Sequence, residues 1–546
     1  MTTTIFSARR ILTMNPSRPE ATHVAVRDGR ILGVGPLDEL TGWGPHTLDT
    51  RFADKVLLPG LVEGHCHVSE GTLWRYLYLG RFDRMDPDGK VWPGAASVEE
   101  VVARLHAGNA GMGASAGPLS GWGLDPIYYG ERRVTRQDFD KVSTTRAVGV
   151  MHASGHIFNV NSHALELAGL LRPGVNHPGV PLGADGLPTG ELKGPDAMTL
   201  VGNHIGFDRE VLANDEPGLR QFARLCVRQG VTTATDLANL LPDDAVAMMV
   251  RVTGEAMFPV RIMPFRRFQG ITAQQAVEHV LALREKSTAM LRLGQIKLFV
   301  DGSIQGFSAR LRWPGYYNGA PNGLWYTPPE AIRDLYRLAL EAGVLVHSHT
   351  NGDQATEMAL DCLEGALLAK PARDHRFTLQ HCQLADAAQF RRMKALGMCV
   401  NLFPNHHFYW GDQHYATTVG PERAMRMNAC ATALSEGVPM AIHSDAPVTP
   451  LGPLFTAWAA VNRRTASGKT LGTAECIGVA DALRTITLGA AYTLRLDGEI
   501  GSIEAGKRAD FAVLEDDPLE IGAERLKDVR IWGTVQGGRV FAAGEV

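Results

Sequence analysis

The stretch PPEAIRDLYRLALEAGVLVHSHTNGD, residues 328–353, contains the signals for a helix, a helix stop and a buried strand, in that order. Pro328 and Glu330 lie where the first turn of a helix is expected, and apolar residues then recur at helical spacing. Gly343 predicts the end of this helix. The apolar run that follows predicts a buried strand. A helix that leads directly into a buried strand is the repeating unit of an α/β fold.

The same unit recurs at several places along the chain. In residues 217–238, 386–404 and 429–447, a helical pattern ends on a glycine immediately before a short apolar run. Repeated units of this kind predict parallel strands, either in a doubly wound sheet or in a (β/α)₈ TIM barrel. No G-x-G-x-x-G follows the first strand, which disfavours a dinucleotide-binding sheet. We therefore predict an α/β protein with a TIM barrel.

Nine runs qualify as barrel strands, although a barrel has eight places. They lie near residues 61, 147, 231, 259, 296, 345, 377, 399 and 440. The run near 147 is the least well framed by helices, so we assign it to a long insertion at about 68–220. Insertions of this size at the active-site end of a barrel usually shape a substrate pocket. The barrel domain, with this insertion, is expected to span residues 59–494.

Both ends of the chain are predicted to be β structure. Residues 22–35 contain two β-rich runs around Arg-Asp-Gly, and residues 529–544 contain two around Gly-Gly, which are hairpin signals. Neither end has enough apolar surface to stand alone. We therefore expect residues 1–58 and 495–546 to pair into one small β-sandwich domain.

Composition restricts the class of protein. Of 546 residues, 45% are apolar and 21% charged, and the net charge of −4 includes no basic run, so no nucleic-acid partner is expected. No apolar stretch reaches the ~18 residues of a membrane span, and no signal peptide is recognisable. Seven cysteines without a C-x-x-C favour reduced thiols. We expect a cytoplasmic protein that binds a small-molecule substrate and no membrane, and the sequence leaves a homo-oligomer open.

Polar side chains stand at the carboxyl ends of five predicted strands, where barrel enzymes carry their active sites. They are His65 and His67, Lys297, His349, His381 and Asp445. Residues i and i+2 of a strand face the same side, so His65 and His67 can point at one ion. Imidazole and carboxylate ligands suit Zn²⁺ and similar divalent ions. The sequence therefore predicts a metal centre, most simply of zinc, at this mouth.

Seven stretches resemble the amidohydrolase superfamily, and within it the YtcJ-like group that includes N-substituted formamide deformylases. They are LPGLVEGHCHV (58–68), ASGHIFNVNSHALELAGL (153–170), IKLFVDGSIQGFSARL (296–311), HSHTNGDQA (347–355), LQHCQLAD (379–386), IHSDAPV (442–448) and GSIEAGKRADFAVLEDDPL (501–519). They span nearly the whole chain in the order that the group shows. This chain departs at Glu63 and Gly64, where relatives more often carry an aspartate and a small residue.

The resemblance implies a TIM barrel, a small β-sandwich built from both termini, and one or two bound metal ions. It implies as metal ligands His65, His67, His349 and His381, with Asp445 on the final strand. In many members the lysine that matches Lys297 is carboxylated by CO₂ and bridges two metals.

Two of these residues have a structural alternative. His347 faces the same side of its strand as His349, but His349 lies nearer the strand end, so we assign the ligand to His349 and leave His347 as a packed neighbour. Lys297 could instead be a buried lysine paired with an acid such as Asp301.

We expect metal-assisted hydrolysis of a carbon–nitrogen bond in an amide, N-substituted formamide, carbamate or cyclic amide. In this mechanism Asp445 moves the proton of the activated water to the leaving amine, and His156 is a candidate donor to the oxyanion. Aromatic residues of the insertion and later loops favour a hydrophobic or aromatic substrate, and they are equally compatible with ordinary core or loop packing. These residues are Trp74, Trp122, Tyr128, Tyr129, Trp313, Tyr316, Tyr317, Tyr409 and Trp410.

Two other hypotheses about function compete with metal-assisted amide hydrolysis. A deaminase with a single metal would leave Lys297 merely structural, but such enzymes usually carry a glutamate just after a later histidine strand, and HTNGD and HCQLAD have none there. A non-catalytic scaffold protein would tolerate loss of the ligands, yet all six positions hold competent groups.

Overall fold

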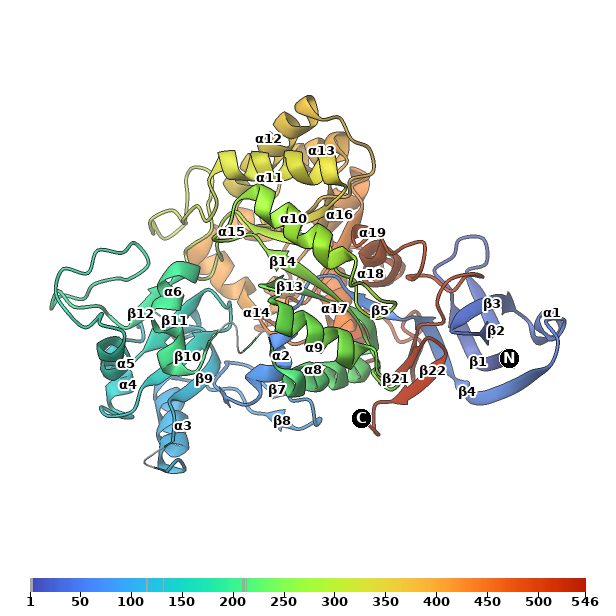
Figure 1. The fold of residues 1–546 in the computed structure, drawn as a ribbon, viewed down its shortest axis with the longest axis horizontal. Coiled ribbons are helices and arrows are strands. Elements are labelled where there is room, and N and C mark those ends of the chain that lie inside the picture. The colour runs from blue at the N-terminus through green and yellow to red at the C-terminus, as the bar shows by residue number, and fades with distance from the viewer. Residues whose placement is uncertain (1–2, 114–115, 131, 209–211, 213) are drawn as a thin grey trace.

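Eight parallel strands form the central sheet of the computed structural model, which describes residues 3–113, 116–130, 132–208, 212 and 214–546. The strands are β5 (Leu61–Glu63), β13 (Val231–Asn239), β14 (Arg261–Arg267), β15 (Gln295–Phe299), β16 (Leu345–Thr350), β17 (Thr378–His381), β18 (Cys399–Leu402) and β19 (Met440–Ile442). Their hydrogen-bonding order follows the chain from β5 to β19, and all neighbouring pairs are parallel. The sheet curls into a TIM-like barrel, seen near the centre of Figure 1.

Helices surround this barrel because each one buries a single apolar stripe against the strands. The main ones are α8 (Glu216–Arg228), α9 (Asp243–Thr253), α10 (Ala273–Arg284), α11 (Pro329–Ala342), α12 (Asp353–Ala369), α13 (Ala387–Leu396), α16 (Cys430–Ser435) and α17 (Pro453–Asn462). In α11 the buried residues include Ile332, Leu335 and Ala339, at helical spacing. Gly343 ends this helix with φ 63°, a left-handed conformation that glycine adopts readily, as the sequence predicts.

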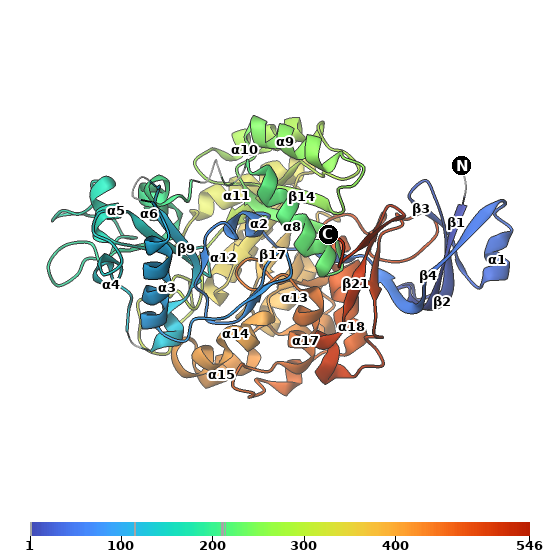
Figure 2. The same ribbon diagram turned by 90° about the horizontal axis from the view of Figure 1, so that it is seen from below.

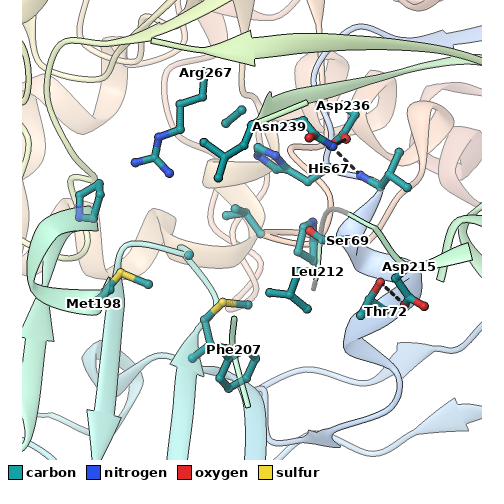
Figure 3. A pocket seen from close by; sticks show the side chains of 18 of the residues that line it. His67, Ser69, Thr72, Met198, Phe207, Leu212, Asp215, Asp236, Asn239 and Arg267 are labelled. Carbon is teal, nitrogen blue, oxygen red and sulfur yellow. Dashed lines mark hydrogen bonds between the residues drawn. The ribbon is translucent and has the colours of Figure 1, made fainter. Parts of the chain in front are cut away.

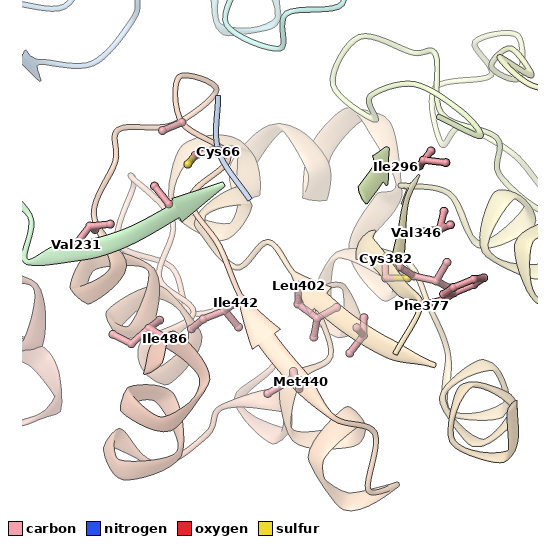
Figure 4. Close-up of a cluster of buried hydrophobic side chains, with 14 of the residues drawn as sticks. Cys66, Val231, Ile296, Val346, Phe377, Cys382, Leu402, Met440, Ile442 and Ile486 are labelled. Carbon is pink, nitrogen blue, oxygen red and sulfur yellow. The ribbon is translucent and has the colours of Figure 1, made fainter. Parts of the chain in front are cut away.

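Alternation along the strands separates an apolar layer from a polar interior. Ile296, Val346 and Ile442 belong to the large apolar cluster between the strands and the helices (Figure 4). Lys297 and His347, one position further along their strands, therefore point to the opposite side, into the barrel. This interior is where the sequence predicts the metal centre.

A second, five-stranded sheet lies to one side of the barrel, at the left of Figure 1. Its strands are β6 (Leu77–Tyr78), β9 (Leu119–Leu124), β10 (Val148–His152), β11 (Ile157–Val160) and β12 (Glu191–Lys193). The run near residue 147 is β10 of this sheet and not a barrel strand. The helices α3 (Val98–Ala110), α5 (Ser162–Leu167) and α6 (Gly194–Gly202) pack with the sheet, which has apolar clusters of its own.

Strands from both termini meet in a seven-stranded sheet on the opposite side of the barrel, as Figures 1 and 2 show. It contains β1 (Thr3–Leu12), β2 (Glu20–Arg27), β3 (Arg30–Gly35), β4 (His46–Pro59), β20 (Phe511–Leu514), β21 (Ile531–Gln536) and β22 (Arg539–Ala542). The two predicted hairpins are confirmed as β2–β3 and β21–β22. Aromatic rings from both termini share its core, with the Phe6 and Phe511 centroids 6.4 Å apart. The hydrogen-bond order gives one continuous sheet, so a two-layered sandwich stays a prediction.

Within the described residues, no helix combines the length and the apolar composition needed to cross a lipid bilayer.

A buried carboxyl group joins the five-stranded sheet to the barrel. Asp125 follows β9 and accepts a hydrogen bond of 3.0 Å from the indole N–H of Trp410, on helix α14 (Asn405–Gln413). Burial raises the pKa of Asp125 to about 7. The folded protein therefore holds a proton at this site that the unfolded chain releases at about pH 4.

We predict that Asp125→Asn changes how stability depends on pH. Because the folded pKa lies above the unfolded one, Asp125 makes the free energy of unfolding fall as pH rises from about 4 to about 7. Asparagine cannot ionise and still offers an oxygen to Trp410. The difference in Tm between the variant and the native protein should therefore shift in favour of the variant by about 2 °C or more from pH 5 to pH 8. Thermal denaturation of both proteins at both pH values measures this shift. If Tm changes by the same amount with pH in the two proteins, the prediction is contradicted.

Candidate metal centre and cavity

His65, His67 and Asp445 converge where the first and last barrel strands meet. Both histidines follow β5, and Asp445 follows β19. The Oδ1 atom of Asp445 lies 3.3 Å from the Nε2 atom of His65 and 3.3 Å from that of His67. The backbone N–H of Asp445 also donates to the carbonyl oxygen of His65 at 3.1 Å, which closes the barrel at this edge.

Lys297 approaches the same cluster from β15. Its Nζ lies 3.4 Å from the Nε2 atom of His65, and the side chain is fully buried. Burial lowers the pKa of Lys297 to about 7, although Asp445 acts in the opposite direction. A neutral amine is therefore accessible near neutral pH. Asp301, its alternative partner, instead accepts backbone N–H groups of Arg310, Asn351 and Gly352.

His349 and His381 complete the predicted set. Their ring centroids lie 4.4 Å apart, and the Nδ1 atom of His381 lies 3.7 Å from Oδ2 of Asp445. The Nε2 atom of His349 lies near the amide of Asn351 and the carbonyl of Gly302. All six predicted ligands thus lie in one cluster at the carboxyl ends of the strands, buried except for the partly exposed His67.

Hydrogen bonds behind the cluster set the orientation of His65. The Oε1 atom of Gln380 lies 2.6 Å from Nδ1 of His65, so this nitrogen carries the proton and donates it. The amide of Gln380 donates at 2.8 Å to His347, whose Nε2 in turn faces the carbonyl of Thr493 at 3.1 Å. His65 is left with Nε2 as its free lone pair, directed at Asp445 and Lys297. This is the arrangement by which a neighbour fixes a metal-binding imidazole.

His443 is a member of the cluster that the sequence analysis did not identify. It directly follows β19 and precedes Asp445 by two residues. Its ring stacks on that of His65 with centroids 4.6 Å apart, and neither of its nitrogens has a hydrogen-bond partner in the described part of the chain. The i, i+2 spacing that singled out His65 and His67 could have identified it in the sequence HSD.

The donor set fits a divalent metal ion. Potential ligand atoms of His65, His67 and Asp445 all lie within 4.8 Å of one another, and so do those of His65, His381 and His443. Nδ1 of His381 and Oδ1 of Asp445 are buried without a hydrogen bond from the described residues. Burial holds the pKa of His65 and His381 well below the usual range, so both are neutral imidazoles, the form that binds metals.

Backbone strain accumulates at two of these positions. His381 has φ 69° and Asp445 has φ 53°, a left-handed conformation that costs non-glycine residues about 1–2 kcal/mol. The surrounding hydrogen bonds keep both residues in place. Such strain is concentrated at functional sites, and here it turns two candidate ligands toward the cluster.

A cavity of about 230 Å³ opens beside the cluster, between the barrel mouth and the five-stranded sheet. His67 and His156 lie in its wall, and Figure 3 shows the labelled side chains that surround it. The His156 ring lies 5.3 Å from that of His349. The wall is mainly apolar; among its residues are Met151, Phe158, Met198, Phe207, Leu219, Met248, Met249 and Phe299.

The nine aromatic residues of the insertion and later loops lie outside the wall of this cavity. Trp122 and Trp410 are almost fully buried in packed regions, whereas Trp313 is 94% exposed. The aromatic residues of the wall are Phe158, Phe207 and Phe299 instead. Large rings in the insertion serve its own core, since the centroids of Trp74 and Trp122 lie 5.2 Å apart. Composition alone cannot distinguish these uses.

Imidazoles and a carboxylate gathered at the carboxyl mouth of a TIM-like barrel are typical of metal-dependent hydrolases. The sequence profile of the amidohydrolase family matches residues 53–542, and the protein belongs to this family. It is therefore a metal-dependent amidohydrolase, an enzyme class that acts on carbon–nitrogen bonds other than peptide bonds.

Several curated relatives cover nearly the whole chain. The Protein LONG AFTER FAR-RED 3 of Arabidopsis thaliana is 28% identical, with 97% of this chain and 90% of the relative aligned. The putative amidohydrolase YtcJ of Bacillus subtilis is 26% identical, with 97% of each chain aligned. The N-substituted formamide deformylase of Arthrobacter pascens is 25% identical, with 95% of this chain and 94% of the relative aligned. The resemblance to this group is thus confirmed.

Solved structures share the fold. An uncharacterized metal-dependent hydrolase from Pyrococcus horikoshii superposes with a TM-score of 0.71 at 21% identity, over 96% of this chain and 99% of the other. The atrazine chlorohydrolase TrzN from Arthrobacter aurescens, in complex with zinc, gives 0.54 at 14% identity, over 99% and 96%. Both likenesses extend along nearly the whole chain.

We predict that Glu63→Ala loosens the closure of the barrel. The buried carboxyl of Glu63 accepts hydrogen bonds from the hydroxyl of Ser444 at 2.7 Å and from its backbone N–H at 3.2 Å. Alanine leaves these donors unpaired, which costs about 1–3 kcal/mol for each group. A lower Tm and weaker metal binding are expected, measured by thermal denaturation and by metal content at a buffered metal concentration.

Glu63→Gln is the matched control. Burial raises the pKa of Glu63 to about 8, so the native side chain is mostly protonated at pH 7 and an amide resembles it. The glutamine variant should keep native stability and metal content. If the alanine variant also keeps native stability and metal content, the closure of the barrel between β5 and β19 does not depend on Glu63.

Proposed function

We propose that the protein hydrolyses a carbon–nitrogen bond in an amide, N-substituted formamide or cyclic amide whose remaining part is small and hydrophobic or aromatic. The observation that carries this proposal is the convergence of His65, His67 and Asp445 at 3.3 Å beside a mainly apolar cavity. The deformylase relative supports the formamide class, because that protein is named for its action on N-substituted formamides.

The metal would be held by His65, His67, Lys297, His349, His381 and Asp445. When bound, a divalent ion, zinc in our proposal, activates water and polarises the scissile carbonyl. Carboxylation of Lys297 is part of the proposal: its neutral Nζ forms a bond to the carbon of CO₂ and loses a proton. The resulting anion can bind a metal, whereas an ammonium group can only donate hydrogen bonds.

The side chains of the protein supply the proton transfer and the substrate position. Asp445 takes the proton of the attacking water on a carboxylate oxygen and passes it to the leaving nitrogen. Burial raises the pKa of this carboxyl group, which makes its protonated form more accessible. His156, in the cavity wall, is placed to donate to the developing oxyanion, and the apolar wall excludes water around the substrate.

The wider setting is also proposed. We divide the chain into a domain of residues 1–58 and 495–546, a β-sandwich in our proposal, and a barrel domain of residues 59–494 with the insertion at about 68–220. We place the enzyme in the cytoplasm, where six of its cysteines, buried and free of disulfides, stay reduced.

The first test is Asp445→Asn. Asparagine keeps a ligand oxygen but cannot accept the proton, so we expect metal to be retained at least in part and kcat to fall about 10²-fold or more. Metal content and turnover of an N-substituted formamide measure the two effects separately. Asp125→Asn, at a buried aspartate that is neither a predicted ligand nor part of the cavity wall, serves as control and should keep native turnover. Near-normal kcat in the metal-loaded Asp445 variant would assign the proton transfer to another group.

The second test is Lys297→Ala. If carboxylated Lys297 bridges two metals, this change removes one metal per chain and most of the activity. Acetate or propionate should restore part of both, because a small carboxylate can occupy the space of the missing group, whereas the native enzyme should not respond. A variant with full metal content and rate contradicts the bridge and favours a single-metal centre.

A further inference from the structure

His443 lies inside the central cluster without belonging to the six ligands predicted from the sequence. It is fully buried, and its ring stacks with those of both His65 and Phe403, at a centroid distance of 4.6 Å in each case. The ring of His381 lies 5.0 Å away at an interplanar angle of 64°. Two predicted metal ligands and one aromatic ring therefore surround this side chain.

Packing alone does not account for an imidazole at this position. A phenylalanine ring would stack as well, whereas two buried imidazole nitrogens cost free energy unless they find partners. Neither Nδ1 nor Nε2 of His443 has a hydrogen-bond partner among the residues that the structure describes. His347, a buried neighbour, differs in this respect, because its nitrogens face the amide of Gln380 and the carbonyl of Thr493. His443 thus keeps a nitrogen lone pair that can bind a metal ion.

The neighbours of His443 are placed to bind the same ion. One potential ligand atom each of His65, His381 and His443 lie within 4.8 Å of one another. Two nitrogens bound to one zinc ion at 2.0–2.1 Å can lie up to about 4.2 Å apart, so side-chain shifts of roughly half an ångström bring all three within reach. Nε2 of His65 is its free lone pair, since Nδ1 of this residue donates to Gln380. Nδ1 of His381 is likewise buried without a hydrogen bond from the described residues.

We propose that His443 is a ligand of the metal centre and binds the same ion as His65 and His381 through one imidazole nitrogen. This adds one residue to the six predicted ligands. All three imidazoles are buried, whereas His67 lines the cavity, so the ion is anchored from the barrel interior and stays open toward water and substrate. The inference rests on the metal centre of the proposed function and not on the identity of the substrate.

His443→Phe tests the proposal, because it keeps an aromatic ring for stacking and removes both nitrogens. Competition with a chelator should give a Kd for zinc at least ~100-fold larger than that of the native protein. This exceeds the ~10- to 100-fold typical for loss of an outer hydrogen-bond partner of a ligand. An unchanged Kd overturns the proposal.

Thermal denaturation separates metal binding from a structural role. After removal of metal by a chelator, the His443→Phe variant should unfold at the native Tm or above it, since no buried nitrogen is left without a partner at this position. The rise in Tm that zinc causes should be much smaller in the variant than in the native protein, because zinc binds the variant more weakly. A lower Tm in the metal-free variant together with an unchanged rise on adding zinc would show that His443 serves only the structure.

His407→Phe is the matched control. His407 lies on α14, is fully buried, and belongs to neither group of potential metal ligands in the described residues. This variant makes the same chemical change at a buried position and should keep the native Kd for zinc and the native rise in Tm. Equal weakening of zinc binding in both variants would trace the effect to packing and overturn the proposal.

Nuclear magnetic resonance detects the bond itself. Protein with ¹⁵N-labelled histidine is saturated with ¹¹³Cd²⁺ in place of zinc, and the ¹⁵N signals that are split by coupling to cadmium are recorded. The native protein should show a split signal that is absent from the His443→Phe variant and present in the His407→Phe variant. If every split signal persists in the His443→Phe variant, His443 is not a ligand.

These outcomes separate the two proposals. Cadmium coupling to His443 without turnover of any N-substituted formamide supports the additional ligand and refutes the proposed reaction on this substrate class. Turnover of an N-substituted formamide together with unchanged zinc affinity in the His443→Phe variant supports the reaction and refutes the additional ligand.

Discussion

The rest of the site depends on the contact between the carboxyl ends of β5 and β19, where Glu63 and His65 meet Ser444 and Asp445. Glu63 and Ser444 are 381 positions apart in the chain, yet the hydroxyl of Ser444 donates to the buried carboxyl of Glu63 at 2.7 Å. One residue further, the backbone N–H of Asp445 donates to the carbonyl of His65. These bonds bring the first and last strands together at the carboxyl end of the barrel. Without them, the His65 and Asp445 side chains would belong to opposite edges of an open sheet.

The barrel interior contains polar, ionisable side chains in place of apolar packing. A lysine and several histidines occupy positions that leucine or valine fills in an ordinary core, and burial disfavours their charged forms. Hydrogen bonds compensate where they can, as in the chain from His65 through Gln380 to His347. Among the buried atoms without a hydrogen bond in the described part of the chain are Nδ1 of His381 and Oδ1 of Asp445, which lie at the candidate metal position. Stability is thus supplied by the apolar layer between strands and helices, and function by the polar layer inside.

The insertion between β5 and β13 supplies much of the cavity wall. The loop around His156 together with α6 supplies the wall of the cavity that faces the barrel mouth. Arg267 comes from the barrel and the apolar residues opposite come largely from the insertion. The cavity therefore lies between two parts of the chain with separate cores, so that changes in the insertion can alter its wall without disturbing the predicted metal ligands.

Local spacing in the sequence determined much of this protein. The glycine at 343 ends a helix, the apolar run after it forms β16, and the i, i+2 spacing of His65 and His67 places both on one side. These signals depend on residues a few positions apart, so they are readable without the fold. The carboxyl ends of the predicted strands also singled out Lys297, His381 and Asp445, and the family resemblance supported this set, which the structure brings into one cluster. Their role as metal ligands stays a prediction.

Only the tertiary structure decided how distant residues meet. It placed the run near 147 in the five-stranded sheet, directed the predicted aromatic residues into other packing, and brought His443 and Arg267 to the site. It also fixed the protonated nitrogen of His65 through Gln380, 315 positions away. These features arise from barrel closure and from the loss of water around buried charges. Both are long-range properties of the folded chain, whereas periodicity and turn residues report only on neighbours along the sequence.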